Sequence, residues 1–258
     1  MKEFFGIGGY SRAPEGFLSP AHIIFVTSLM AVMIFLGIFL GRKNRLADEK
    51  KKMRAITVCA IAIDAIELFK IVFLCFRENN PMHWIINLPL FLCSLQLIAL
   101  PLAAFSKGRV REASLDFIFI FGLLGAVLGT YGAGQNYACY PVLSFDNVVS
   151  GVTHTISGFA SLYIGISGLS SMKKRNVPLT FLIITVFGIL AYVADILIPY
   201  NYMFLIRGDG TPYDIFYNLV GGNPVLYPMI VMGLFYAYIA VFYAVTAAVK
   251  KKKLKTEE

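Results

Sequence analysis

Apolar segments of about 20 residues recur along the chain between short polar loops, and this pattern limits the fold more than any other feature. A helix of that length crosses the hydrocarbon core of a bilayer, which is about 30 Å thick. Hydrophobic residues make up 58% of the chain and charged residues only 15%, against about 25% charged residues in a typical soluble domain. The sequence therefore predicts an all-α, polytopic membrane protein without a soluble domain.

Seven apolar segments are long enough to span a membrane. We expect transmembrane helices at about residues 20–41, 55–76, 84–105, 113–131, 147–169, 178–198 and 224–249. Residues 1–19 would then be an interfacial N-terminal segment, residues 20–249 the seven-helix domain and residues 250–258 a basic tail. No internal repeat relates two halves of the chain, which counts against a duplicated transporter fold.

Basic residues gather in the loops on one side of these spans. The loops 42–54, 106–112 and 172–177 and the tail 250–258 hold 7, 3, 3 and 5 of the 23 lysines and arginines. Such a bias predicts that the C-terminus lies in the cytoplasm and the N-terminus outside, in a multi-pass protein of the plasma membrane. The net charge of +8 is thus a topology signal and does not indicate nucleic-acid binding.

The segment Asn87–Gln96 is unusually polar for a membrane span. It places Pro89, Cys93 and Gln96 inside the apolar run 84–105. Lipid offers such groups no hydrogen bonds, so neighbouring segments must supply their partners. We therefore expect the polar contacts of the protein to be organised around this segment.

Charged residues stand within two other spans. Asp64, Glu67 and Lys70 lie in the second span, and Asp195 lies in the sixth. A charge at mid-helix costs about 2.5–3.5 kcal/mol, so these residues must face protein or a wet cavity. Their spacing lets Glu67 pair with Lys70. The group is either a structural ion pair or part of a proton or substrate path.

Most of these polar groups fall in the outer half of the bilayer. At a helical rise of about 1.5 Å per residue, Cys93 lies about 14 Å and His154 about 10 Å below the outer ends of their spans. One cavity open to the outer side would bring them together. The substrate-binding residues expected to line that cavity are His22, Glu67, Gln96, Asp195 and Asn201.

Cys93 and His154 form the candidate catalytic pair. A thiol is a weak nucleophile until a base or cation lowers its pKa, and a histidine at similar depth can act as that base. Asp195, Glu67 or Asn201 would orient the imidazole as the third member of a triad. The alternative is that Cys93 is a small buried filler without chemistry.

Other functional classes lack their motifs. The chain has no phosphate loop, nucleotide fingerprint, His-Glu-x-x-His zinc motif or Gly-x-Ser-x-Gly elbow. Its 4 cysteines have neither the spacing of a disulfide framework nor that of a zinc site, and its 3 histidines make a poor metal site. We therefore expect neither a metal nor a cofactor, and the oligomeric state is left open.

Short motifs resemble those of the YwaF-like integral membrane proteins of bacteria and occur in the same order. Leu88–Ser94 is similar to the LPLHLC segment of that family, Asn201–Leu205 to its NYMFL segment, and Ser19–His22 to the motif that opens its first span. His154 stands where the family places a histidine, and the seven-span layout also matches. One residue departs from the pattern, because Phe91 replaces the histidine two positions before the cysteine.

This resemblance implies an activity. A related eukaryotic branch transfers fatty acyl chains between phospholipids through a cysteine thioester, so Cys93 would carry the acyl group and His154 would be its base. Asn201 and His22 would line the site. Membrane lipid would be the acyl donor and acceptor. If the family histidine is the base, then without it at position 91 either His154 acts alone or the chemistry is lost.

Three functions follow as alternatives. The first is an intramembrane acyltransferase or acyl hydrolase that acts on phospholipid. The second is a small-solute or proton-coupled transporter, whose flux Glu67→Gln would abolish and Cys93→Ser would spare. The third is a non-enzymatic assembly partner, which would tolerate alanine at Cys93 and His154. A separation of sulfur and imidazole compatible with hydrogen bonding favours the first.

Overall fold

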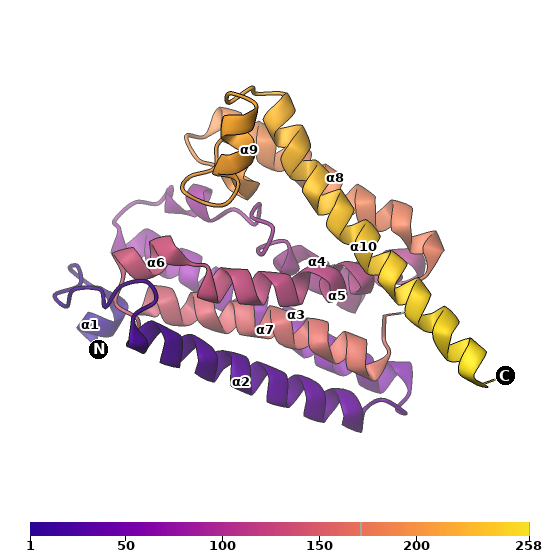
Figure 1. The fold of residues 1–258 in the computed structure, drawn as a ribbon. Coiled ribbons are helices and arrows are strands. Elements are labelled where there is room, and N and C mark those ends of the chain that lie inside the picture. The colour runs from indigo at the N-terminus through magenta and orange to yellow at the C-terminus, as the bar shows by residue number, and fades with distance from the viewer. Residues whose placement is uncertain (171, 258) are drawn as a thin grey trace.

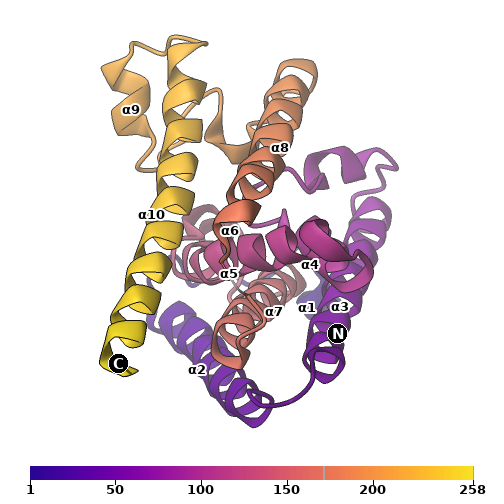
Figure 2. The same cartoon turned by 90° about the vertical axis from the view of Figure 1, so that its right-hand side faces the viewer.

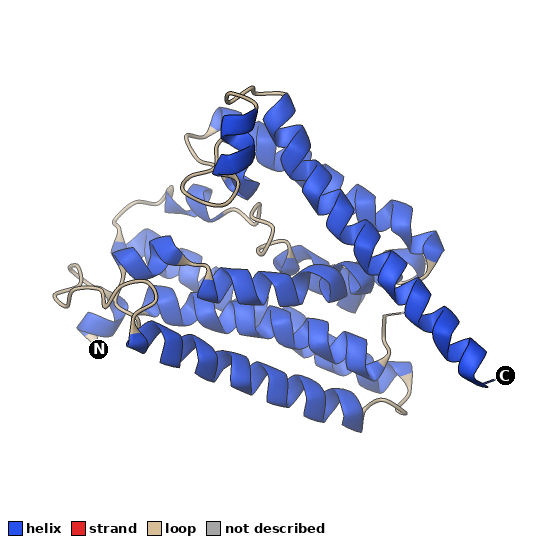
Figure 3. Cartoon of the chain, viewed as in Figure 1, coloured by secondary structure: helices blue, strands red, loops and turns tan. Residues whose placement is uncertain are grey.

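The protein is built of helices and loops, as Figure 3 shows. The computed structural model describes residues 1–170 and 172–257, with side chains described as far as residue 251. These residues contain no β-strand, which confirms the all-α prediction. Most side chains of the predicted basic tail 250–258 lie outside the described residues.

Short loops connect most of the helices. In chain order the helices are α1 (Lys2–Phe5), α2 (Pro20–Lys43), α3 (Glu49–Arg77), η1 (His83–Asn87), α4 (Gln96–Phe105), α5 (Gly108–Tyr131), α6 (Gly134–Cys139), α7 (Phe145–Ser167), η2 (Lys174–Asn176), α8 (Val177–Leu197), η3 (Tyr202–Phe204), α9 (Asp214–Leu219) and α10 (Leu226–Glu257).

Four stretches of the described chain are long and apolar enough to cross a membrane: Pro20–Lys43, Gly108–Cys139, Lys174–Leu197 and Leu226–Lys251. The protein is therefore a multi-pass membrane protein. α3 and α7 are of similar length. They are less apolar, because α3 carries charged residues and α7 is rich in serine, threonine and glycine.

The helices α2, α3, α5 and α7 form a bundle, and α8 and α10 pack obliquely across it (Figures 1 and 2). α7 lies at the centre, in contact with α2, α3 and α5. Its neighbours approach closely. A Cβ added to Gly41 of α2 would lie 2.8 Å from Ile166, and one added to Gly122 of α5 would lie 2.6 Å from the carbonyl oxygen of Ser157. Small residues at such contacts are typical of helix packing in membranes.

The predicted span 84–105 is wrong as a continuous helix. After η1 the chain is irregular through residues 88–95, and only then does α4 begin. Pro89 explains the break, because it has no N–H group and forces Leu88 into an extended conformation with ψ of 144°. The depth inferred for Cys93 assumed a helical rise and does not hold. Irregular backbone at membrane depth must be enclosed by protein or line a cavity.

The loops rich in lysine and arginine lie together at one end of the bundle, which we call the basic end (Figure 1). Ion pairs connect them. Arg111 lies 3.3 Å from Glu49, and Glu112 lies 3.0 Å from Lys173 and 2.7 Å from Arg175. The chain therefore alternates in direction from helix to helix, in agreement with the charge bias of its loops.

At the opposite end the N-terminal segment is tied to the bundle. Arg77 of α3 forms a bidentate ion pair with Asp146 of α7, at 2.6 and 3.0 Å. Tyr10 donates a hydrogen bond to the same carboxylate. Burial, and then this hydrogen bond, raise the pKa of Tyr10 to about 12, so the phenol remains a neutral donor at physiological pH. The segment therefore folds onto the end of the bundle.

A buried carboxylate joins the α8–α10 pair to the bundle near the basic end. Asp116 of α5 is fully buried. Its two oxygens accept hydrogen bonds from Ser170 Oγ at 2.7 Å, Met172 N at 3.2 Å, Asn176 Nδ2 at 2.9 Å and Tyr243 Oη at 2.9 Å. We call these five residues the Asp116 junction. A buried charge is tolerated only when it is paired or hydrogen-bonded in this way.

Candidate functional site

Cys93 lies on the irregular segment between η1 and α4, one turn before the first residue of α4. Its side chain is half-buried. It packs against α5, where a Cβ added to Gly125 would lie 3.5 Å from the Cβ of Cys93. Cys93 therefore precedes the N-terminus of α4, whose dipole favours negative charge.

His154 of α7 has one ring nitrogen engaged and one free. Nδ1 lies 2.7 Å from the carbonyl oxygen of Ser150. A carbonyl only accepts hydrogen bonds, so Nδ1 carries the proton in the neutral ring and Nε2 keeps a lone pair. Nε2 is buried and has no hydrogen-bond partner among the described residues. His154 is thus in the tautomer that a general base requires.

Glycine on α5 makes the room that this imidazole occupies. A Cβ added to Gly129 would lie 1.9 Å from His154 Nε2. Gly125 and Gly129 stand one turn apart on the same face of α5, so one stripe of the helix seats both the thiol and the imidazole. The spacing of the two glycines allows close helix packing, and Gly129 in addition leaves room for the imidazole ring.

The thiol and the imidazole are neighbours. The Cys93 side chain and the His154 ring are close enough to interact electrostatically. The contact is looser than a well-aligned hydrogen bond, because Nε2 has no partner of full geometric quality. Loose contacts of this kind are common in catalytic sites without substrate. The pair that the sequence proposed is therefore brought together by α4, α5 and α7.

The group that orients the imidazole is not one of those expected. Asp195, Glu67 and Asn201 form no hydrogen bond with the ring, and the carbonyl of Ser150 takes that role from within α7. A main-chain carbonyl at position i−4 leaves no trace in the residue types, so the sequence did not reveal it.

Gln96 is the most unusual polar residue near the pair. It is the first residue of α4, one turn after Cys93, and it is fully buried. Neither Nε2 nor Oε1 of its amide has a hydrogen-bond partner. A buried amide without partners costs about 1–3 kcal/mol. Such a group is expected where a ligand supplies the missing partner.

Glu67 and Lys70 form the ion pair that their spacing indicates. Both side chains are mostly buried, with exposed fractions of 15% and 19%. The ammonium of Lys70 is close enough to act electrostatically on His154. Asp64, one turn earlier on α3, has a buried Oδ1 without a partner. These three residues belong to α3, which packs against both α4 and α7.

His22 is fully buried at the start of α2. Its Nδ1 accepts a hydrogen bond from the N–H of Leu18 at 3.0 Å, and its Nε2 lies 3.2 Å from the carbonyl oxygen of Thr130. The ring also packs against Tyr137, with 3.9 Å between ring centroids. Both nitrogens are thus occupied, and His22 joins the start of α2 to the end of α5.

Asp195 and Asn201 organise the loop that follows α8. Asp195 Oδ1 accepts a hydrogen bond from the N–H of Tyr202 at 2.6 Å, and its Oδ2 is buried without a partner. The amide of Asn201 makes three hydrogen bonds within its own loop, at 2.7, 2.8 and 3.2 Å. Both N–H donors of Asn201 are therefore used within the loop, and its Oδ1 accepts one hydrogen bond there.

Phe91 packs into a cluster of aromatic rings. Its centroid lies 5.9 Å from that of Tyr200, 5.2 Å from that of Tyr202 and 6.2 Å from that of Phe204. Position 91 thus contacts the loop after α8, whereas Cys93 contacts α5. The irregular segment before α4 is thus held by contacts with the loop after α8 and with α5.

Within the part of the chain that the structure describes, no group of three or more histidine, cysteine, aspartate or glutamate side chains is arranged to hold a metal ion. The described cysteines are free thiols. The chemistry available at the site is therefore that of a thiol, an imidazole, an amide and an ion pair.

Comparison with known proteins places the chain in one family. No curated protein and no solved structure matches it. A sequence profile of the TMEM164 family matches residues 17–249, a range that contains Cys93, His154 and their seats on α5. Because the match covers most of the chain, the protein belongs to the TMEM164 family.

Proposed function

We propose that this protein is an intramembrane acyltransferase that moves fatty acyl chains between phospholipids through a thioester on Cys93. The observation that carries the proposal is the state of His154. Ser150 fixes the proton on Nδ1, and the free lone pair of Nε2 stands beside the thiol. The substrate class, phospholipid, is inferred from the resemblance of the motifs around Cys93 and Asn201 to those of YwaF-like proteins.

In the first half of the reaction, His154 Nε2 takes the proton of the Cys93 thiol. The thiolate attacks the carbonyl carbon of a phospholipid ester, and the ester C–O bond breaks. The lysophospholipid leaves as an alcohol after Nε2 returns the proton to its oxygen, and the acyl group remains on sulfur.

In the second half, the hydroxyl group of an acceptor lysophospholipid gives its proton to Nε2 and attacks the thioester carbonyl. The C–S bond breaks, and the thiolate recovers the proton from the imidazolium. Water in place of the acceptor would give a free fatty acid, so hydrolysis is the competing outcome. A site enclosed by α4, α5 and α7 limits the access of water.

Gln96 and Lys70 have the right chemistry for the polar parts of such a substrate. The side-chain N–H group of Gln96 is an unused donor for the carbonyl oxygen, which becomes an oxyanion in both tetrahedral intermediates. Lys70 supplies a positive charge near the pair for the phosphate of the headgroup. Both assignments rest on the proposed acyl transfer.

We also propose that the basic end faces the cytoplasm and the N-terminus faces outward in the plasma membrane, with seven crossings of which the third is the broken segment η1–α4. The gathering of basic loops at one end supports this orientation. His154 then lies about 14 Å from the outer start of α7, at 1.5 Å per residue. Lipid of the outer leaflet would supply the substrate.

The proposal is tested with purified protein, a phospholipid labelled in one acyl chain and a lysophospholipid acceptor. Label should move to the acceptor with the wild type and not with Cys93→Ala or His154→Ala. Cys75→Ala and Cys139→Ala are the matched controls, because they remove thiols elsewhere and should retain activity. Transfer that persists in Cys93→Ala, or that is absent from the wild type, would refute the proposal.

A further inference from the structure

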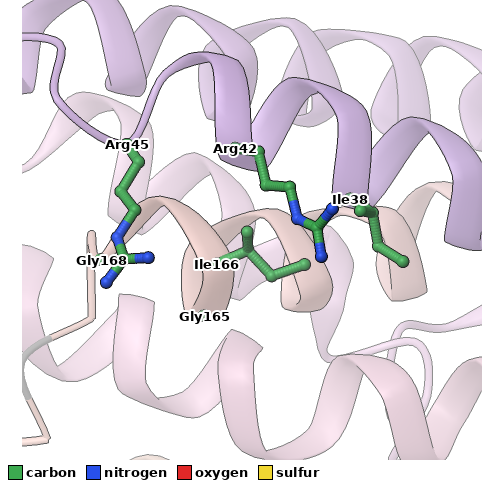
Figure 4. Close-up of a pocket in the computed structure, with 6 residues that line it drawn as sticks. All are labelled: Ile38, Arg42, Arg45, Gly165, Ile166 and Gly168. Atoms are coloured by element: carbon green, nitrogen blue, oxygen red, sulfur yellow. The ribbon is translucent and has the colours of Figure 1, made fainter.

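A groove at the basic end has the features of a binding site and lies apart from the Cys93–His154 pair. It runs between the last turns of α2 and α7 and has a volume of about 470 Å³. Figure 4 shows two arginine side chains of the α2 end reaching toward the last turn of α7. The lining residues are Ile38, Arg42, Arg45, Gly165, Ile166 and Gly168.

The groove exists because two tightly packed helices end side by side. α2 and α7 are in close contact at Gly41, where an added Cβ would lie 2.8 Å from Ile166. Two residues after Ile166 the chain leaves α7 at Gly168, whose φ of 73° is left-handed and turns the chain away. α2 ends at the same level. The space between the two ends is therefore set by the backbone.

Arg42 and Arg45 have no ion-pair partner among the described residues, in contrast to Arg111 and Arg175 at the same end. Arg111 and Arg175 pair with Glu49 and Glu112, and Arg109 donates to a main-chain carbonyl. In the described part of the chain no carboxylate or carbonyl engages the side chains of Arg42 and Arg45. Positive charge near a helix C-terminus is favourable by itself, but that does not require two guanidinium groups over a common groove.

The floor and mouth of the groove are apolar. Ile38 and Ile166 line it together with two glycines. Phe35 lies seven residues before Arg42, nearly two full turns, and so shares its face of α2. Its ring is 66% exposed. An apolar path therefore leads from the two arginines onto the surface of α2 that faces the membrane interior.

We propose that this groove binds a phospholipid by its phosphate, which Arg42 and Arg45 would grip while an acyl chain follows Phe35 along α2. Guanidinium groups bind phosphate oxygens through paired, charge-assisted hydrogen bonds, and basic pockets between helices at the cytoplasmic face are suited to anionic headgroups. A soluble phosphate compound would use the arginines but leave the apolar path empty. The bound lipid is distinct from an acyl donor, because no residue of the groove belongs to the catalytic pair.

The test is native mass spectrometry of the delipidated full-length protein with three probes. Phosphatidylglycerol carries phosphate and chains, diacylglycerol has the chains alone, and glycerol phosphate has the phosphate alone. The wild type should bind phosphatidylglycerol, should bind diacylglycerol at least about tenfold more weakly, and should not release the lipid to an equal concentration of glycerol phosphate. A factor of ten corresponds to the loss of a single charge-assisted bond.

Three variants decide whether the arginines are responsible. The double variant Arg42→Gln, Arg45→Gln should weaken phosphatidylglycerol binding by about tenfold or more. Replacement of both arginines by lysine should give an intermediate loss, because lysine keeps the charge but cannot form the paired hydrogen bonds of a guanidinium group. Lys43→Gln removes one neighbouring charge outside the groove and should change binding less than about twofold. These side chains are exposed, and unchanged thermal unfolding confirms that the variants fold. An equal loss in Lys43→Gln, equal binding of diacylglycerol, or displacement by glycerol phosphate would overturn the proposal.

Discussion

The Asp116 junction and the Cys93–His154 site are both clusters of buried polar groups in an apolar protein, but they differ in how far their hydrogen bonds are made. The carboxylate of Asp116 accepts four hydrogen bonds from three segments of the chain. At the other site, His154 Nε2 and both polar atoms of Gln96 have no partner. The two clusters thus differ in degree, because among the described residues of the junction only Asn176 Oδ1 lacks a partner.

This difference separates structural from functional polar residues better than burial or residue type does. A network whose hydrogen bonds are nearly all made has little capacity left for a ligand, and it fixes the elements that contribute to it. Buried groups without partners cost stability, and under the proposed function those near the thiol and the imidazole are open to the substrate. We therefore expect mutations at the junction to change stability and mutations at the site to change activity.

The largest effect is expected from Cys93→Ala. Removal of the nucleophile should lower acyl transfer by about 10³-fold or more, while the free energy of unfolding changes by about 1 kcal/mol or less because a small, half-buried thiol is lost. Transfer rates and thermal unfolding measured on the same preparation test this. A loss of activity accompanied by general unfolding would mean that Cys93 is structural.

Asp116→Ala should show the opposite pattern. The substitution leaves four donors without their charged acceptor. Charge-assisted hydrogen bonds contribute about 1.5–3 kcal/mol each to stability. Solvent and rearrangement of the side chains restore part of that loss. We expect about 3 kcal/mol of destabilisation, with activity per folded molecule retained. Asp116→Asn keeps the shape and one acceptor and should lose less. Loss of activity in fully folded Asp116→Ala would break the distinction between the two clusters.

Gly129→Ala tests the seat of the imidazole. The added Cβ would lie 1.9 Å from His154 Nε2, so the ring must move, and a displacement of about 1 Å at a catalytic group can cost about 100-fold in rate. Gly125→Ala is the matched control one turn away, because its Cβ would meet Cys93 at an ordinary 3.5 Å. Equal activity of the two variants would show that the position of the ring is not important.

Gln96→Leu should raise the stability of the protein and lower its rate of acyl transfer. Leucine has a similar size and removes two buried polar atoms without partners, so we expect a gain of about 1 kcal/mol in the free energy of unfolding. Loss of an oxyanion donor should lower transfer by about 100-fold. Thermal unfolding and transfer rates measure the two effects separately, and destabilisation would mean that Gln96 has partners that were not identified.

Phe91→His should have the smallest effect on chemistry. The side chain at position 91 packs among Tyr200, Tyr202 and Phe204, and His154 already supplies the base. We expect transfer per folded molecule to change less than about threefold, with some loss of stability from the aromatic cluster. A large gain in activity would show that the histidine of the YwaF-like pattern is a working base and that His154 alone is insufficient.

The sequence predicted the helices well where apolar runs are bounded by polar loops, as in α2 and α8. It failed between residues 84 and 105, because an apolar run cannot distinguish a helix from irregular chain that neighbouring helices enclose. Pro89 was the available signal for the break. Cys93 and His154 were paired from their depths, although the depth of Cys93 rested on a helix that is interrupted.

Other parts of the candidate site were beyond the reach of the sequence. Every residue has a main-chain carbonyl group, so residue types could not indicate that the carbonyl of Ser150 orients His154. Asp116 looks like an ordinary residue after a basic loop, and one of its partners, Tyr243, lies 127 residues away. His22 and Asn201 were expected at the site from their depth and from the family resemblance, whereas the structure engages both in hydrogen bonds within the protein.

The central claim is that Cys93 carries an acyl group. It is tested most directly by incubating the purified protein with a phospholipid of defined acyl chain, digesting it and measuring the mass of the peptide that contains Cys93. The account predicts a mass increase equal to one acyl group on that peptide, removed by neutral hydroxylamine and reduced at least about 100-fold in His154→Ala. An unmodified Cys93 peptide in protein that transfers acyl chains, or an acyl group found on another residue, would contradict it.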